Sequence, residues 1–299
     1  MNLKICGALL FFCFLAGGFI VAAEPIVEEG ITYAKVGDTE LKLDLARPSS
    51  PGPHPGIVFI HGGGWYQGSR QGYRDDIEEA AKRGYVAVTL SYRLMQFDTQ
   101  NRDTTKASPI FPAQINDCKS GVRWLRANAT KYQLDPARIG VTGGSAGGHL
   151  SLLVGLADAA AKLEGESGYL DQSSRVQAVV NVFGPTEMAS CYQTSSVAWI
   201  FRLFMGGTPD ESPRTYSMSS PVTYASADDP PVLTIHGDKD VLVPIDQAHK
   251  LDAAIKAAGG KHQLLILKGQ GHGFRDEYKT QSEEAMWKFF AEHLKPSGT

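Results

Sequence analysis

The stretch that decides the fold is Arg138-Ile139-Gly140-Val141-Thr142-Gly143-Gly144-Ser145-Ala146-Gly147-Gly148-His149-Leu150. Residues 138–142 are typical of a buried strand and the apolar run 149–156 of a buried helix, so the chain must turn sharply between them. Gly143 and Gly147 have no side chains and let strand and helix approach closely. The pattern therefore predicts that Ser145 stands at the tip of a strained turn with its hydroxyl exposed.

A serine hydroxyl is a weak nucleophile, so this interpretation requires a histidine base and an acid that orients it. The base candidate is His272, which lies in a glycine-rich loop after the strand-like residues 263–267. The acid candidates are Asp240 and Asp238, which follow the strand-like residues 231–235. The chain order Ser, Asp, His is that of the α/β-hydrolase fold.

Backbone donors for an oxyanion are predicted in His61-Gly62-Gly63-Gly64-Trp65, directly after the apolar strand 56–60. Glycines leave their N–H groups bare, and the N–H of the residue after the nucleophile completes the usual set. Gly63, Gly64 and Ala146 are therefore the predicted oxyanion hole, with Gly63 and Gly64 as alternatives to each other. Trp65 is interpreted as a substrate-binding wall of the pocket, with a core aromatic as the alternative.

These motifs resemble the α/β-hydrolase esterases that carry His-Gly-Gly-Gly-Trp and Gly-Xaa-Ser-Ala-Gly-Gly, including relatives of hormone-sensitive lipase. Further similar stretches are Phe111-Pro112-Ala113-Gln114, Phe183-Gly184-Pro185-Thr186 and Ser220-Pro221-Val222-Thr223-Tyr224. The resemblance extends over nearly the whole mature chain. It implies a secreted bacterial esterase that removes acetyl or feruloyl groups from plant polysaccharides. It also implies that the acid is Asp240 and the base His272, with Asp238 as the fallback.

Two segments depart from the regular pattern. Polar residues at about 95–110 stand where this family usually runs directly from strand to helix, and they are equally compatible with a pocket-shaping loop and an ordinary surface insertion. Residues 188–217 interrupt the alternation of strands and helices and carry an apolar cluster around Trp199 and Phe201. This small insertion is predicted to form a partial cap, either as a lid over the substrate or as a helix packed on the core.

The rest of the chain alternates strands with helices, which predicts an α/β fold whose mostly parallel central sheet has helices on both faces. Two antiparallel strands are expected first. The expected strands are 31–36, 41–46, 56–60, 85–90, 138–142, 176–182, 231–235 and 263–267, and the expected helices are near 75–83, 113–128, 149–156, 245–258 and 282–294.

Composition agrees with a globular enzyme, since 42% of the 299 residues are hydrophobic and the net charge is −3. This mild acidity gives no electrostatic signature for nucleic acid. No run has metal-ligand spacing, so neither a metal nor another cofactor is predicted. The histidines outside the motifs at positions 54, 249, 262 and 293 are interpreted as surface residues, His61 and His236 as local hydrogen-bonding residues, and His149 as packed or capping.

The first 23 residues are typical of a secretory signal peptide, with Lys4, an apolar run and small residues before a cleavage site after Ala23. Residues 24–299 are then a single catalytic domain, secreted or periplasmic, with no stable membrane insertion. Its two cysteines, Cys118 and Cys191, could form a disulfide in such a compartment or remain buried thiols.

Three functions remain compatible with the sequence. The first is a serine carboxylic ester hydrolase whose partner is a small ester or an acylated carbohydrate. The second is an amidase or peptidase with the same triad. The third is a catalytically silent binding module on the same scaffold. Neither the acyl and alcohol specificity nor the oligomeric state can be inferred from the sequence.

Overall fold

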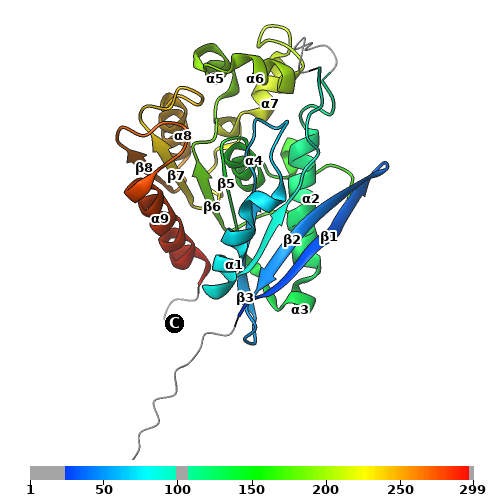
Figure 1. Ribbon diagram of the computed structural model, residues 1–299. Coiled ribbons are helices and arrows are strands. Elements are labelled where there is room, and N and C mark those ends of the chain that lie inside the picture. Colours follow the sequence, from blue (N-terminus) through cyan, green and yellow to red (C-terminus); the bar gives the residue numbers. More distant parts are fainter. Residues whose placement is uncertain (1–23, 99–106, 296–299) are drawn as a thin grey trace, which may run out of the picture.

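One eight-stranded sheet organises the molecule, and the computed structural model describes residues 24–98 and 107–295 of it (Figure 1). Its strand order is β1-β2-β4-β3-β5-β6-β7-β8. β1 and β2 pair antiparallel, β2 joins β4 antiparallel, and every later pairing is parallel. The strands are β1 Ile26–Val36, β2 Thr39–Arg47, β3 His54–Ile60, β4 Val86–Leu90, β5 Leu134–Gly144, β6 Ala178–Val182, β7 Val232–Gly237 and β8 His262–Leu267. This is the predicted α/β-hydrolase architecture.

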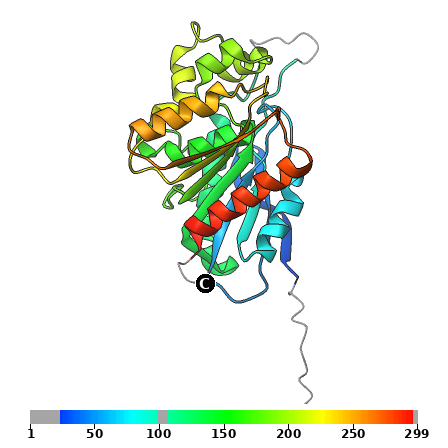
Figure 2. The same cartoon turned by 90° about the vertical axis from the view of Figure 1, so that its left-hand side faces the viewer.

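Helices cover both faces of the sheet, as Figure 2 shows for α9 on one face and α8 on the other. α1 (Arg74–Lys82) and α9 (Asp276–Leu294) share one apolar cluster with the sheet. The opposite face packs against α2 (Ala113–Ala127), α4 (Ala146–Leu156) and α8 (Asp246–Ala257). The short α3 (Ala129–Tyr132) connects α2 to β5.

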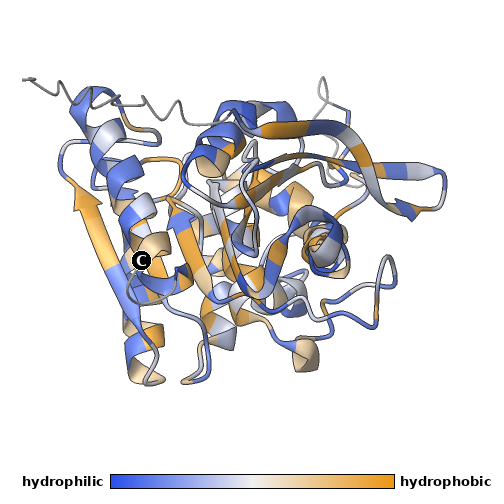
Figure 3. Cartoon of the chain, turned by 90° about the horizontal axis from the view of Figure 1, so that it is seen from below, coloured by the Kyte–Doolittle hydropathy of each residue, from blue (hydrophilic) through white to orange (hydrophobic). Residues whose placement is uncertain are grey.

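The central strands are buried on both faces, which explains their nearly continuous apolar sequences. Ile57, Val58, Phe59 and Ile60 of β3 all lie in the interior, and their side chains alternate between the two clusters. Apolar colouring in Figure 3 follows these inner strands. Full burial of such a side chain contributes roughly 1.5–3 kcal/mol, so the two clusters fix the sheet that carries the functional loops.

Three helices form a cap above the carboxyl ends of the parallel strands (Figure 1): α5 (Met188–Thr194), α6 (Ala198–Met205) and α7 (Pro213–Ser219). Phe201 and Phe204 of α6 are buried in the main core. Trp199 and Ile200 are partly exposed and line a cavity, to which Phe201 also contributes. The predicted alternatives therefore both apply in part, because α6 is packed on the core and also covers the cavity.

Several element boundaries differ from the sequence expectations. β1 begins at Ile26 and has register shifts between Glu28 and Ile31 and between Thr32 and Ala34. α9 begins at Asp276, six residues before the expected start, because its first residues are mostly polar and have no apolar periodicity. In the 95–110 insertion, only the two ends are described, and Gln96 pairs with Ser108 there in an antiparallel bridge.

The predicted signal peptide lies outside the described residues and stays a prediction. In residues 24–98 and 107–295, none of the helices combines the length and apolar character needed to cross a membrane.

Candidate active site

Ser145 occupies a strained turn between β5 and α4, as the sequence predicts. Its backbone has φ 57° and ψ −123°, a conformation that residues other than glycine rarely adopt. A Cβ atom added to Gly143 or Gly147 would overlap the backbone of Ile60, so the close approach of β3, β5 and α4 requires glycine at both positions. The Ser145 N–H donates to the Val182 carbonyl at 2.9 Å, which holds the turn against β6.

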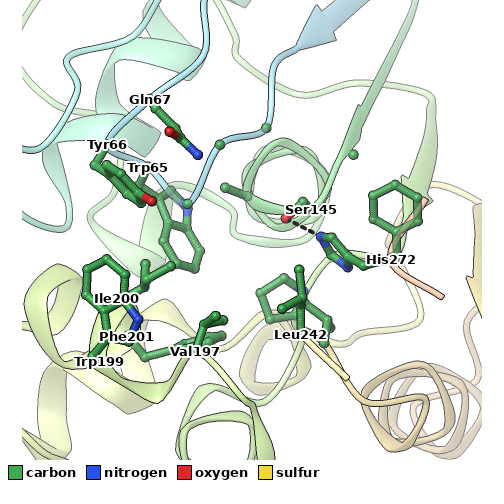
Figure 4. A pocket seen from close by; sticks show the side chains of 18 of the residues that line it. Trp65, Tyr66, Gln67, Ser145, Val197, Trp199, Ile200, Phe201, Leu242 and His272 are labelled. Atoms are coloured by element: carbon green, nitrogen blue, oxygen red, sulfur yellow. Dashed lines mark hydrogen bonds between the residues drawn. The ribbon is translucent and has the colours of Figure 1, made fainter. Parts of the chain in front are cut away.

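Three side chains from loops far apart in sequence form one hydrogen-bonded chain (Figure 4 shows its Ser145–His272 step). The Ser145 Oγ lies 2.8 Å from His272 Nε2, and His272 Nδ1 lies 2.7 Å from Asp240 Oδ2. Since an ionised carboxylate can only accept, the Nδ1 of His272 carries the hydrogen. The Nε2 atom is then free to accept the proton of the Ser145 hydroxyl.

Asp240 is held as an anion by its surroundings. Burial raises its pKa, but hydrogen bonds from His236 and His272 outweigh that effect and lower the pKa to about 2. Its other oxygen, Oδ1, accepts the N–H groups of Leu242 and Val243 at 2.9 Å each. This geometry decides between the two acid candidates, because the Asp238 carboxylate points elsewhere.

Asp238 instead ties two loops together. Its Oδ1 accepts the N–H of Gly269 at 2.7 Å, and its Oδ2 lies 3.5 Å from Lys268 Nζ. The backbone hydrogen bond and the lysine lower its pKa, although burial opposes them. Asp238 therefore supports the loop that leads to His272 and does not contact the imidazole.

The predicted oxyanion donors line the space in front of Ser145. Gly63 has φ 108° and Gly64 has φ 58°, and the Gly63 carbonyl accepts the N–H groups of Tyr66 and Gln67. These bonds curl the loop at Gly63 and Gly64, beside the cavity. Ala146 is the first residue of α4, where an N–H has no acceptor within the helix. All three residues line the cavity, which keeps them as candidate donors.

The cavity in front of Ser145 has a volume of about 520 Å³ and is mostly apolar. A volume of this size is within the range of small-molecule binding sites. Its apolar and aromatic lining includes Phe183, Val197, Trp199, Ile200, Phe201 and Leu242. Its polar lining, apart from Ser145 and His272, includes Tyr66, Gln67 and Tyr73.

Trp65 is more a core residue than the predicted pocket wall. Only 2% of it is exposed, and its ring stacks on Phe204 at 4.1 Å with an interplanar angle of 3°. Its Nε1 donates to His149 Nδ1 at 3.3 Å, and His149 Nε2 in turn donates to the Ser219 carbonyl at 2.7 Å. One edge of Trp65 still lines the cavity, so the residue links the oxyanion loop to the cap.

The remaining histidines mostly agree with their predicted roles, but the prediction for His262 was wrong. His61 Nδ1 contacts the Gly62 carbonyl at 2.8 Å, and buried His236 contacts the Val243 carbonyl at 2.8 Å. His262, predicted at the surface, has a buried side chain that bridges Asp252 (2.7 Å) and the Thr234 hydroxyl (2.9 Å). Its partners lie on α8 and β7, so the burial of this side chain depends on packing that its position in the sequence did not reveal.

Cys118 and Cys191 are buried free thiols in the structure, and not a disulfide, which was the other arrangement compatible with the sequence. Burial raises the pKa of both well above the ordinary range of a thiol. The described residues contain no group of three or more His, Cys, Asp or Glu side chains placed to hold a metal ion.

Sequence reasoning assigned no role to Phe183, Tyr66 or Phe97. The Phe183 ring lies 4.6 Å from the His272 ring, with a backbone φ of 43°, so it packs directly on the predicted base. Tyr66 lies 5.3 Å from Phe97. Phe183 belongs to one quoted motif and Tyr66 follows another, so position next to a motif was the signal that could have identified them.

Known proteins of similar sequence and fold are esterases. The BD-FAE family model matches residues 43–255. Esterase LipC of Mycobacterium tuberculosis is 32% identical over 228 residues, which are 74% of this chain and 53% of that protein. The chain thus spans about half the length of the curated relatives that it matches.

Two solved structures are similar over most of their length. A truncated carbohydrate esterase from gut microbiota has 29% identity and a TM-score of 0.77, with 91% of this chain and 97% of that chain covered. A thermophilic esterase, Est2 of the planctomycete Thermogutta terrifontis in its propionate-bound form, has 28% identity and a TM-score of 0.74, with 90% and 96% covered. Since the family model matches well over half of the residues, the chain belongs to the BD-FAE family of α/β-hydrolase esterases.

Proposed function

We propose that this protein is a serine carboxylic ester hydrolase in which Ser145 is the nucleophile, His272 the general base and Asp240 the orienting acid. The observation that carries the proposal is the unbroken chain from Ser145 Oγ to His272 Nε2 (2.8 Å) and from His272 Nδ1 to Asp240 Oδ2 (2.7 Å). Both distances are within hydrogen-bond range, which is the condition for proton transfer by a positioned base.

The first half of the reaction forms an acyl-enzyme. His272 Nε2 accepts the Ser145 proton while Oγ attacks the ester carbonyl carbon, and Asp240 stabilises the positive charge that develops on the imidazole. The carbonyl oxygen becomes an oxyanion facing the N–H groups of Gly63 or Gly64 and Ala146. Loss of one such donor costs on the order of 3 kcal/mol of transition-state stabilisation. His272 then returns the proton to the leaving alcohol.

The second half restores the free enzyme. A water molecule gives a proton to His272 Nε2 as its oxygen attacks the acyl carbon, and the bond from Ser145 Oγ to that carbon breaks. The proton passes back to Oγ, and the carboxylic acid is released. The strained backbone of Ser145 keeps Oγ in the same place through both halves.

The substrate class proposed is an ester of a carbohydrate or a small alcohol that carries an acetyl or feruloyl group. The name of the similar carbohydrate esterase and the family match support this choice. Secretion or periplasmic location is proposed from the signal-peptide pattern of residues 1–23. An acylated polysaccharide outside the cell is a substrate that an enzyme in that location could reach.

The test is hydrolysis of p-nitrophenyl acetate and butyrate, methyl ferulate and acetylated xylan by the mature chain. Ser145→Ala should abolish turnover with an unchanged circular dichroism spectrum, whereas the control Ser217→Ala, at an exposed serine of α7, should retain it. Turnover that survives Ser145→Ala would refute the assignment. Cleavage of p-nitroacetanilide, added to the panel as an amide, without cleavage of any ester would favour the amidase alternative, and a folded protein inactive on every substrate would favour the binding module.

A further inference from the structure

The direction of the acyl group in the cavity follows from the reaction, and this step rests on the proposed function. In the tetrahedral intermediate, the leaving oxygen must lie within hydrogen-bond reach of His272 Nε2. The oxyanion must face the N–H groups of the oxyanion loop and Ala146. The acyl chain takes the remaining direction, away from His272.

That direction leads beneath α6 of the cap. Figure 4 shows Ser145 between His272 on one side and Trp65, Ile200 and Phe201 on the other. The oxyanion loop meets the cap closely here, because a Cβ atom on Gly64 would lie 3.3 Å from Ile200 Cγ2. The acyl end of the cavity is therefore the end between the oxyanion loop and α6.

Three aromatic rings meet at this end of the cavity, and we call Tyr66, Phe97 and Trp199 the aromatic wall. Their ring centroids are separated by 5.3 Å (Tyr66–Phe97), 5.9 Å (Tyr66–Trp199) and 5.9 Å (Phe97–Trp199). These distances are within the range of favourable aromatic pairs. Tyr66 and Trp199 line the cavity, whereas Phe97 contacts both rings without lining it.

Each ring of the wall comes from a different segment: the oxyanion loop, the 95–110 insertion and α6. The insertion is anchored next to Phe97 by backbone hydrogen bonds, since Met95 N–H donates to the Trp65 carbonyl and Gln96 pairs with Ser108, all at 2.9 Å. This anchoring fixes the position of the Phe97 ring against the other two.

We propose that Phe97 is a positioning residue that holds Tyr66 and Trp199 as the far wall of an acyl pocket selecting bulky apolar acyl groups over acetyl. A cavity of about 520 Å³ is far larger than a two-carbon acyl group requires. A hydroxycinnamoyl group or a medium-chain alkanoyl group reaches the wall and gains apolar contact there. An acetyl group stays close to Ser145 and gains none.

The experiment keeps the alcohol constant and varies the acyl group. Hydrolysis of methyl acetate, methyl hexanoate and methyl ferulate is followed by pH-stat titration for the wild type, Phe97→Ala, Phe97→Tyr and Trp199→Ala. The matched control is Tyr169→Ala, because Tyr169 is an aromatic residue with 45% exposure outside the cavity. Thermal unfolding of each variant shows whether it is folded.

In Phe97→Ala, the ratio of kcat/KM for the bulky ester to that for methyl acetate should fall about 5-fold, mainly through KM. Trp199→Ala should lower this ratio at least as much, because its ring contacts the acyl group directly. Phe97→Tyr retains the ring and should restore the ratio, and the control should match the wild type. Whether hexanoate or ferulate loses more identifies which of the two acyl classes the wall selects.

An equal loss of kcat/KM on all three esters, or an unchanged ratio, would overturn the inference and leave the proposed function intact. A second series with constant acetate, methyl acetate against 2-naphthyl acetate, examines the opposite arrangement. If Phe97→Ala changes that series and not the acyl series, the wall binds the alcohol and the inference is wrong. A folded wild type that hydrolyses no ester would instead refute the proposed function itself.

Discussion

Replacing Asp240 and Asp238 separately with asparagine distinguishes their roles. Asp240→Asn is the more informative of the two substitutions. The amide is nearly the same size as the carboxylate, so the loop can keep its shape. What changes is hydrogen bonding, because one acceptor oxygen becomes an NH₂ donor. In the native protein Oδ2 accepts from His272 Nδ1, and Oδ1 accepts from the N–H groups of Leu242 and Val243.

Neither orientation of the amide satisfies these partners. If the NH₂ faces His272, Nδ1 must become the acceptor, the hydrogen moves to Nε2, and the base can no longer accept the Ser145 proton. If the NH₂ instead faces Leu242 and Val243, two backbone donors lose their acceptor, at a cost of roughly 1–3 kcal/mol each. The first orientation is therefore favoured, and it inactivates the base.

We expect kcat to fall about 10⁴-fold, the loss that a serine protease suffers on the same substitution, or about 5.5 kcal/mol of barrier. Asp238→Asn keeps an acceptor for the Gly269 N–H and should lower kcat less than 3-fold, roughly 0.6 kcal/mol. The assay is initial-rate hydrolysis of p-nitrophenyl acetate at pH 8, with circular dichroism to confirm folding. A greater loss in Asp238→Asn, or a loss under 10-fold in Asp240→Asn, would refute the assignment of the acid.

Three further predictions concern stability and the thiols. Gly147→Ala places a Cβ atom against the β3 backbone and should lower the free energy of unfolding by about 3 kcal/mol, which lowers Tm by roughly 6–10 °C. The control Gly72→Ala has open space around its Cβ atom and should leave Tm within about 2 °C of the wild type. Burial lowers the pKa of His149 from 6.5 to about 4, so the unfolded state binds more protons than the folded state between these pH values, and the free energy of unfolding falls as the pH drops through that window. Urea titrations should show a slope of up to about 1.4 kcal/mol per pH unit there, and a smaller slope in His149→Gln. An equal slope in both proteins would contradict the reasoning. In a protein that comprises residues 24–299, Cys118 and Cys191 should react with a thiol reagent only after unfolding in denaturant without reductant. An absence of reactive thiols would show a disulfide.

Local sequence predicted the inner parallel strands β3, β4, β6 and β7 well because they are buried on both faces and therefore almost continuously apolar. The first strand and the start of the last helix were harder to predict from local sequence. β1 is half exposed and irregular near Glu28, and the first turns of α9 have mostly polar side chains, so neither has the apolar periodicity that a prediction needs. His262 failed for a related reason, because its burial depends on Asp252 and Thr234, which no local pattern places beside it.

The sequence by itself determined the parts of the site whose chemistry is local. The turn at Ser145 requires glycines at fixed neighbouring positions, and the chain order of Ser145, Asp240 and His272 reflects the order of the strands that carry them. The residues alone left Asp238 and Asp240 open, and the family resemblance implied Asp240. The tertiary structure shows that Asp240 reaches His272, since the two side chains lie two residues apart in one loop and point in different directions. It also decided that Trp65 is chiefly a core residue and that Phe97 joins Tyr66 and Trp199, because such contacts depend on the positions of segments about 30 to 130 residues apart, which no local pattern specifies.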